Sequence, residues 1–162
     1  MAGTDEVMER IMAAIEVGRT GETALARDRL TALWEEVGPD GDPLHRCTVA
    51  HYLADLQEDP VDELAWDQRA LDAAGTLTDE RAQQFHSSLV VKGFLPSLHL
   101  NLAEDHRTLG DLARAREHVD LAQRLSAALP DDPYGTMVRQ AIARVSAALP
   151  APAPPDAHAA AM

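Results

Sequence analysis

Cysteine is nearly absent from this sequence, because Cys47 is the only one among 162 residues. A single thiol excludes an intrachain disulfide framework and is typical of proteins in a reducing compartment. The sequence also lacks any apolar run near the roughly 20 residues that span a bilayer. Its start, MAGTDEVMER, has neither the basic nor the apolar region of a signal peptide. We therefore expect a soluble, cytoplasmic protein.

Basic residues are scarce as well. Lys and Arg together number 14 against 27 Asp and Glu, which gives a net charge of −13. Binding to nucleic acid or to an anionic membrane needs a basic surface, so we expect neither kind of partner. Most of the acidic excess lies in residues 1–91. There it favours either solubility or the attraction of a basic protein partner.

Apolar residues recur at helical spacing along most of the chain, and Gly and Pro separate the periodic stretches. Asp42-Pro43, Asp59-Pro60 and Asp132-Pro133 each read as a helix start, with Asp as the cap and Pro in the first turn. Thr78 and Asp111 are further candidate caps. The pattern predicts an all-α chain with helices over residues 5–18, 22–37, 44–57, 61–74, 78–92, 98–109, 112–129 and 133–149.

The stretch from Leu98 to Leu129 is the most informative. Small residues at Ala103, Ala115 and Ala122 allow two antiparallel helices to approach closely around a turn at Gly110. The stretch resembles a tetratricopeptide repeat. Small, Gly, small, large and small residues stand at the spacing that this family uses, namely Ala103, Gly110, Ala115, Val119 and Ala122. His106 stands where the family places an aromatic residue, and we expect it to pack in the interior.

Two earlier segments repeat the pattern. Ala14, Gly21, Ala26 and Leu30 form a first copy, and residues 44–74 form a second in which no Gly marks the turn. The resemblance implies antiparallel helical hairpins stacked as a short right-handed solenoid over residues 1–149. It would hold about three repeats, an inserted helix at 78–92 and a C-terminal capping helix. Residues 78–109 form two helices in this interpretation, the alternative being one helix kinked at Pro96. The Pro/Ala-rich tail, residues 150–162, is expected to be disordered.

The resemblance also implies a function, because tetratricopeptide repeats bind proteins and peptides in a concave groove. We therefore expect a non-catalytic adaptor or regulatory scaffold without a cofactor. Its partner would be a basic or amphipathic segment of another protein. The groove positions that the resemblance assigns are Met8, Ile11, Ile15, Leu44, Cys47, His51, Asp55, Leu100, Glu104 and Arg107.

Cys47, His51 and Asp55 raise an alternative, because their i, i+4, i+8 spacing places them on one helical face. Thiolate and imidazole bind transition metals such as zinc, and His86 or His99 would have to complete such a site. A thiolate–imidazole nucleophile oriented by Asp55 is a second possibility. The simplest interpretation is a half-buried face with a hydrogen-bonded histidine. The alternative function is thus a metal- or small-ligand-binding protein, possibly an enzyme, centred on Cys47 and His51.

Motifs of nucleotide and hydrolytic enzymes are missing from the sequence. It contains no Gly-rich phosphate loop, no G-x-S-x-G, no H-E-x-x-H and no paired C-x-x-C. The sequence therefore favours binding over catalysis.

Overall fold

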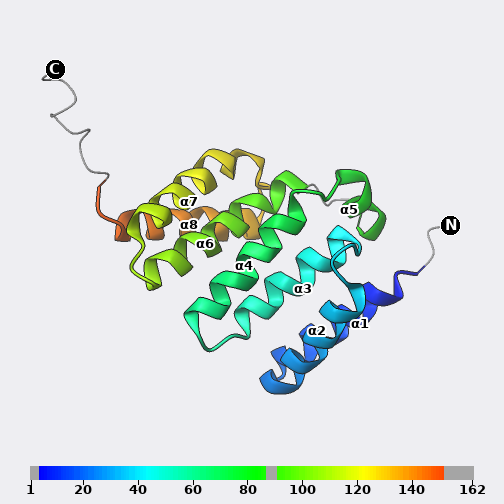
Figure 1. Cartoon of the computed structure of the whole chain (residues 1–162). Coiled ribbons are helices and arrows are strands. Elements are labelled where there is room, and N and C mark those ends of the chain that lie inside the picture. The colour runs from blue at the N-terminus through cyan, green and yellow to red at the C-terminus, as the bar shows by residue number, and fades with distance from the viewer. Residues whose placement is uncertain (1–3, 87–90, 152–162) are drawn as a thin grey trace, which may run out of the picture.

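The computed structural model describes residues 4–86 and 91–151, and within them the fold is all-α, with no strand (Figure 1). None of the described helices has the length and apolar character of a membrane span. Residues 152–162, most of the predicted tail, lie outside the described part. The α-helices are α1 (Glu6–Arg19), α2 (Thr23–Val37), α3 (Pro43–Asp55), α4 (Pro60–Ala74), α5 (Asp79–Phe85), α6 (Leu95–Thr108), α7 (Leu112–Leu125) and α8 (Pro133–Ala148).

Most helix starts are confirmed, and side-chain caps explain them. The carboxylates of Asp42, Asp59, Asp111 and Asp132 each accept a hydrogen bond from a backbone N–H of the first helical turn, and the Thr78 hydroxyl does the same for α5. Pro occupies the first turn of α3, α4 and α8, where its missing N–H costs no hydrogen bond.

Glycines close the turns that join α1 to α2 and α6 to α7. Gly21 follows α1 with φ +100°, and Gly110 separates α6 from α7 with φ +83°. No atom would lie within 4 Å of a Cβ at either position. The positive φ, and not a shortage of space, therefore selects glycine at both turns.

Two predicted helices are too long. α5 ends at Phe85, because His86 is extended with φ −148° and ψ 125°, and residues Val91–Gly93 form a short 3₁₀ helix. Leu89 and Val90, predicted to belong to this helix, lie outside the described residues. α6 begins at Leu95, so α5 and α6 are two separate helices, as expected. α7 ends at Leu125, and a 3₁₀ turn at Ser126–Ala128 follows.

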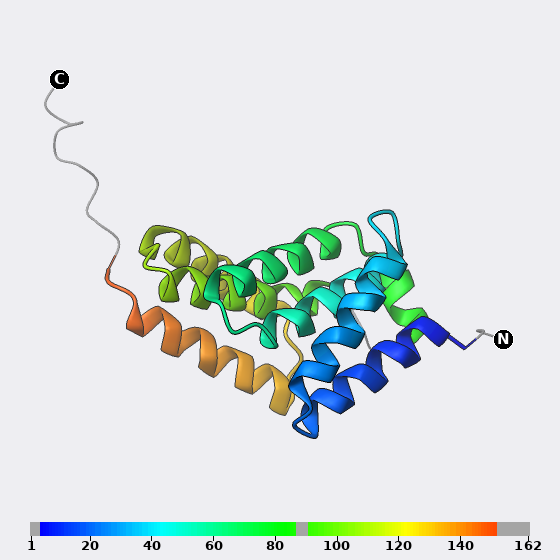
Figure 2. The same ribbon diagram turned by 60° about the horizontal axis from the view of Figure 1, so that its bottom comes forward.

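Neighbouring helices pack in pairs. α1 packs on α2, α3 on α4 and α6 on α7, and the pairs contact one another through α2 with α3 and α4 with α6. Ala26, Ala115 and Ala122 are fully buried, as close helix contacts require. α8 packs on both α6 and α7 at the end of the chain. In Figure 2, α1 and α8 lie on opposite sides of the face that comes forward, with α3 between them.

Candidate functional site

Five helices contribute to a pocket of about 330 Å³, which we call the central pocket. This volume is at the lower end of the range for ligand pockets and suits one or two large side chains. Most of its lining is apolar or aromatic. The residues that line it are Met8, Met12, Leu44, Cys47, Thr48, His51, Tyr52, Phe85, Phe94, Ser97, Leu98 and Tyr134.

Helical spacing places these side chains together. Met8 and Met12 are one turn apart on α1, and each α3 residue of the pocket has another pocket residue three or four positions away on the same helical face. Tyr134 comes from α8, and its hydroxyl oxygen lies 3.2 Å from Oγ of Ser97 on α6. The side chains of Met12 and Phe85 are 39% and 40% exposed, so the pocket offers apolar surface to a ligand.

Ionisation is disfavoured inside the central pocket. Burial raises the pKa of the Cys47 thiol to about 11, so the thiol is protonated at neutral pH. Burial also lowers the pKa of His51, against an opposing effect of the Asp55 charge. Nδ1 of His51 lies 3.4 Å from Nδ2 of Asn101, and its ring meets the Tyr52 ring edge-on. A neutral thiol is a weak nucleophile and a weak metal ligand.

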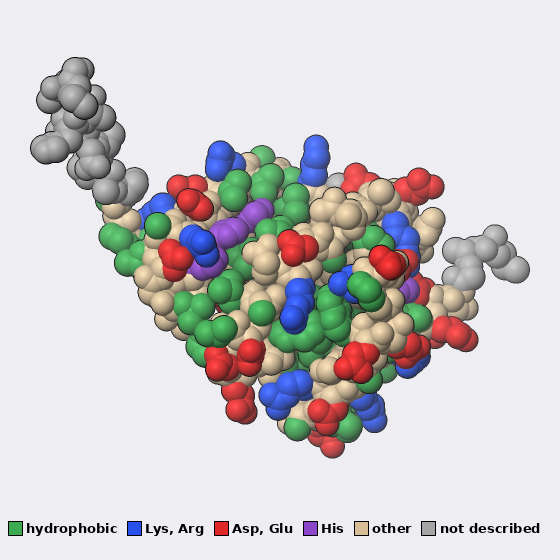
Figure 3. Space-filling model, viewed as in Figure 1, with side chains coloured by type: hydrophobic (Ala, Val, Ile, Leu, Met, Phe, Trp, Pro, Cys, Tyr) green, Lys and Arg blue, Asp and Glu red, His purple; other side chains and the backbone are tan. Residues whose placement is uncertain are grey.

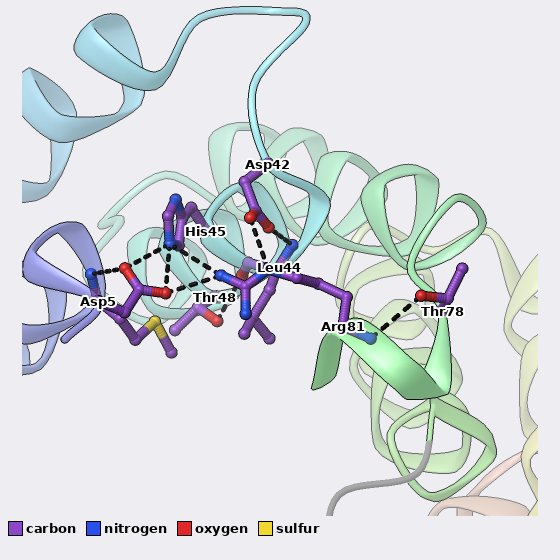
Figure 4. A network of polar contacts seen from close by, with 8 residues as sticks. Asp5, Asp42, Leu44, His45, Thr48, Thr78 and Arg81 are labelled. Carbon is purple, nitrogen blue, oxygen red and sulfur yellow. Dashed lines mark hydrogen bonds and ion pairs between the residues drawn. The ribbon is translucent and has the colours of Figure 1, made fainter. Parts of the chain in front are cut away.

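An ion-pair network beside the pocket holds α5 in place; we call it the Arg81 network (Figure 4). Arg81 of α5 donates to Asp5 at 2.7 Å and to Asp42 at 2.6 Å, while Nε2 of His45 lies 2.9 Å from both carboxylate oxygens of Asp5. Burial opposes the ionisation of Asp5, but hydrogen bonds from His45, the Met8 N–H and Arg81 lower its pKa to about 2.

Asp5 and Asp42 also cap α1 and α3, so Arg81 ties α5 to the starts of both helices. This contact positions Phe85, the last residue of α5, against the central pocket. Phe85 also lines a second pocket, of about 730 Å³, which has Glu9 in its wall. Glu9 forms no ion pair with any of the described residues. One carboxylate without an ion-pair partner, Glu9, therefore lies beside the central pocket.

The predicted groove residues divide into groups. Leu44, Cys47 and His51 do lie together in the central pocket, whereas Asp55 is exposed and does not line it. Ile11 is 0% exposed and Ile15 belongs to the same core cluster, so neither offers surface to a ligand. Their assignment to the groove is corrected, because the apolar stripe of α1 packs onto the neighbouring helices. Met8, also on α1, is 3% exposed but lines the central pocket.

The predicted groove residues of α6 line a different pocket. Leu100, Glu104 and Arg107 lie in a pocket of about 360 Å³ between α6 and α8 that shares no lining residue with the central pocket. Arg107 donates to Glu104 at 2.8 Å, so part of their charge is paired locally. The predicted residues of α1, α3 and α6 therefore do not form one continuous groove. The position of α8 could not be read from the sequence.

The proposed ligands of a transition metal are also dispersed. His99 pairs with His118 of α7 and not with Cys47 or His51, since the two Nδ1 atoms lie 3.1 Å apart. His86 is exposed at the end of α5. Within the described part of the chain, one group of three side chains brings potential metal-ligating atoms within 4.8 Å of one another. That group contains neither Cys47 nor any histidine.

The group consists of Glu63 and Asp67 of α4 and Asp105 of α6; we call it the acidic cluster. Burial raises the pKa of Asp67 to about 9, and a hydrogen-bonding contact with Asp105 and the charge of Asp105 add to the effect. The i, i+4 spacing of Glu63 and Asp67 was visible in the sequence. That Asp105 faces them depends on the packing of α4 on α6, which no local pattern indicates.

Comparisons of the chain with protein-family models, with curated proteins and with solved structures give no match. The function must therefore be inferred from the geometry and chemistry of the site itself.

Proposed function

We propose that this chain is a tetratricopeptide-repeat-like adaptor that binds a segment of a partner protein in the central pocket. The pairs α1/α2, α3/α4 and α6/α7 would be its three repeats, α5 the inserted helix and α8 the cap of a right-handed solenoid. Equivalent positions in the first and third pairs support this proposal, because glycines with positive φ occupy both turns. The matching small and large positions are buried in both pairs, namely Ala14 with Ala103, Ala26 with Ala115, and Leu30 with Val119.

The central pocket is the observation on which the proposal depends. It combines buried apolar walls with the exposed apolar side chains of Met12 and Phe85, and an unpaired carboxylate, Glu9, lies on the same helix as Met12. A partner segment fits this surface if it places one large apolar side chain in the pocket and a basic side chain near Glu9. An amphipathic helix has such a pattern at i, i+3 or i, i+4.

The chemistry of the pocket favours binding over catalysis. The Cys47 thiol is protonated at neutral pH, and the histidine near it is held by the amide of Asn101. Neither arrangement activates a nucleophile, which needs an ionised thiol or an adjacent base. We therefore propose a non-catalytic role in the cytoplasm, with no cofactor at the central pocket.

The experiment uses two equally exposed apolar residues. Met12 lines the central pocket, whereas Leu25 lies on α2 away from it, and both are 39% exposed. The tagged full-length chain, Met12→Glu and Leu25→Glu serve as baits in cytosol of the cells that make the protein. Circular dichroism spectra establish first that both variants fold as the original chain does.

We expect a partner that the original chain and Leu25→Glu retain and that Met12→Glu loses, because a charge at the mouth of an apolar pocket is poorly tolerated. The partner's binding segment should then contain the apolar and basic residues described above. A partner lost with Leu25→Glu and retained with Met12→Glu would place binding on another face and contradict the proposal.

A further inference from the structure

Three carboxylates converge inside the molecule where α4 packs on α6. Glu63 and Asp67 are one turn apart on α4, Asp105 comes from α6, and one oxygen of each lies within 4.8 Å of the others. Two oxygens bound to one Ca²⁺ at about 2.4 Å can lie up to about 4.8 Å apart, on opposite sides of the ion. The acidic cluster therefore already has the span of a cation's ligand shell.

The cluster lacks a positive partner among the described residues. Asp67 is 2% exposed and Asp105 is 4% exposed, and neither takes part in an ion pair. Oδ2 of Asp105 is buried and receives no hydrogen bond. Asp67 and Asp105 make a hydrogen-bonding contact with each other, but no cationic side chain of the described residues pairs with either. A buried oxygen without a hydrogen bond, in a group without a counter-charge, is costly and needs a separate explanation.

The surroundings add to the negative charge. Asp55 and Glu104 both act on Asp105 as like charges, whereas the hydrogen-bonding contact with Asp67 and the charge of His106 act in the opposite direction. Asn101 offers one weak contact, since its Nδ2 lies 3.5 Å from Oδ1 of Asp67. The same nitrogen lies 3.4 Å from His51, so Asn101 connects the cluster to the central pocket.

We propose that Glu63, Asp67 and Asp105 form a binding site for a divalent cation that prefers oxygen ligands, of the Ca²⁺ and Mg²⁺ class. Carboxylate oxygens are the ligands that these hard cations prefer, and water molecules complete their shells. The ion supplies the missing counter-charge to the buried pair and joins α4 to α6. The half-buried Glu63 lies at the solvent side of the cluster and gives the ion a route of entry.

The test measures binding of Ca²⁺ alone, and of Mg²⁺ alone, to the full-length chain after treatment with a chelator and dialysis. Isothermal titration calorimetry should show one ion per chain with a dissociation constant below about 1 mM. The melting temperature should rise with the concentration of the ion, because only the folded chain holds the three carboxylates together.

The matched variants are Asp67→Asn, Asp105→Asn and Asp62→Asn. Asp62 is an exposed acid on the same helix and serves as the control. Asp67→Asn and Asp105→Asn should weaken binding by more than about tenfold, whereas Asp62→Asn should bind as the original chain does. If either buried variant fails to fold, Glu63→Gln replaces it, because Glu63 is only half-buried, and it should also weaken binding.

Two outcomes would overturn the proposal. The first is no saturable binding of either ion at concentrations up to about 10 mM, well above the weakest ordinary calcium sites. The carboxylates would then be held together by a proton alone. The second is binding that persists unchanged in Asp67→Asn or Glu63→Gln, which would place the ion at another acidic surface.

Discussion

His99 of α6 and His118 of α7 face each other with their Nδ1 atoms 3.1 Å apart and their rings stacked at a centroid distance of 5.3 Å. His106, one of the buried residues of α6, also stacks on His118, at a centroid distance of 5.4 Å. Histidine side chains gather on this face of the molecule in Figure 3. Three neighbouring rings cannot all be protonated without mutual repulsion. We therefore expect the contact between α6 and α7 to be sensitive to pH.

The first prediction concerns this sensitivity. Burial lowers the pKa of His99 and of His118, and charge on a neighbouring histidine lowers each further. The histidines of the unfolded chain have a pKa near 6.5. As the pH falls, they therefore bind protons at a higher pH than the same histidines do in the folded chain. The histidine contribution to the free energy of unfolding should be constant above about pH 6.5 and should fall as the pH falls below it. Asp67, whose pKa is raised to about 9, contributes in the opposite direction over the same interval, so the histidine contribution is measured as a difference between variants.

Urea unfolding between pH 5 and pH 8 measures the effect. His118→Phe keeps a ring for stacking but cannot be protonated, so it should reduce the loss of stability below pH 6.5. Some loss should remain, because burial also lowers the pKa of His51. A His118→Phe variant with the same pH dependence as the original chain would contradict the proposed coupling.

The second prediction concerns Gly110. Its φ of +83° is costly for residues with a Cβ, although no atom would block a side chain there. Gly110→Ala should lower the free energy of unfolding by about 1–2 kcal/mol. Gly93→Ala is the control, since φ at Gly93 is not in the left-handed range and the nearest atom to its Cβ would be 3.9 Å away. Equal stability of the two variants would show that the turn adapts without strain.

Much of the all-α fold could be predicted because its signals are local. Asp59-Pro60 starts a helix through its own carboxylate and ring, and Gly110 ends one through its own backbone freedom. The end of α5 could not be predicted, because the apolar positions continue past Phe85 in the sequence while the backbone turns at His86. The hydrophobic period describes which residues share a face, and it does not by itself end a helix.

The candidate site was only partly predictable. Leu44, Cys47 and His51 could be assigned together because one helix presents them at fixed spacing. Tyr134 and Phe85 reach the same pocket from helices distant in sequence, and the acidic cluster needs α4 and α6 in contact. Such positions depend on tertiary packing. They carry no local signal beyond the residue type itself.

The third prediction concerns Ala115, which is fully buried where α6 and α7 pack together. Ala115→Leu adds three carbons to a contact that has no room for them, and should lower the free energy of unfolding by about 1–3 kcal/mol. Ala113→Leu, at an exposed position of the same helix, should change it little. Chemical denaturation of both variants makes the comparison. An unchanged midpoint for Ala115→Leu would mean that the two helices are not closely packed.

The fourth prediction concerns Arg81, whose guanidinium joins the caps of α1 and α3 to α5. Arg81→Gln keeps the side chain as far as Cδ, shortens it beyond that atom and removes its charge. The free energy of unfolding at pH 7 should fall by about 1–2 kcal/mol, because partly buried charged hydrogen bonds are lost. In Arg81→Gln, the amide hydrogens of α5 should exchange faster than those of the neighbouring α3, because α5 has only seven residues and depends on the Arg81 contacts.

The pH dependence of the Arg81→Gln effect separates the ion pairs from packing. The pKa values of Asp5 and Asp42 are lowered in the folded chain, so their contribution is complete above their ordinary pKa near 3.9 and is lost as the pH falls towards 2. The difference between Arg81→Gln and the original chain should therefore shrink over this interval.

Arg10→Gln is the control, because Arg10 pairs with Glu36 through two bonds of 2.7 Å but both side chains are largely exposed. Arg10→Gln should change the free energy of unfolding little at any pH. A difference in the free energy of unfolding between Arg81→Gln and the original chain that persists at pH 2 would assign the effect to the packing of the side chain. Apolar contacts alone would then hold Phe85 at the central pocket.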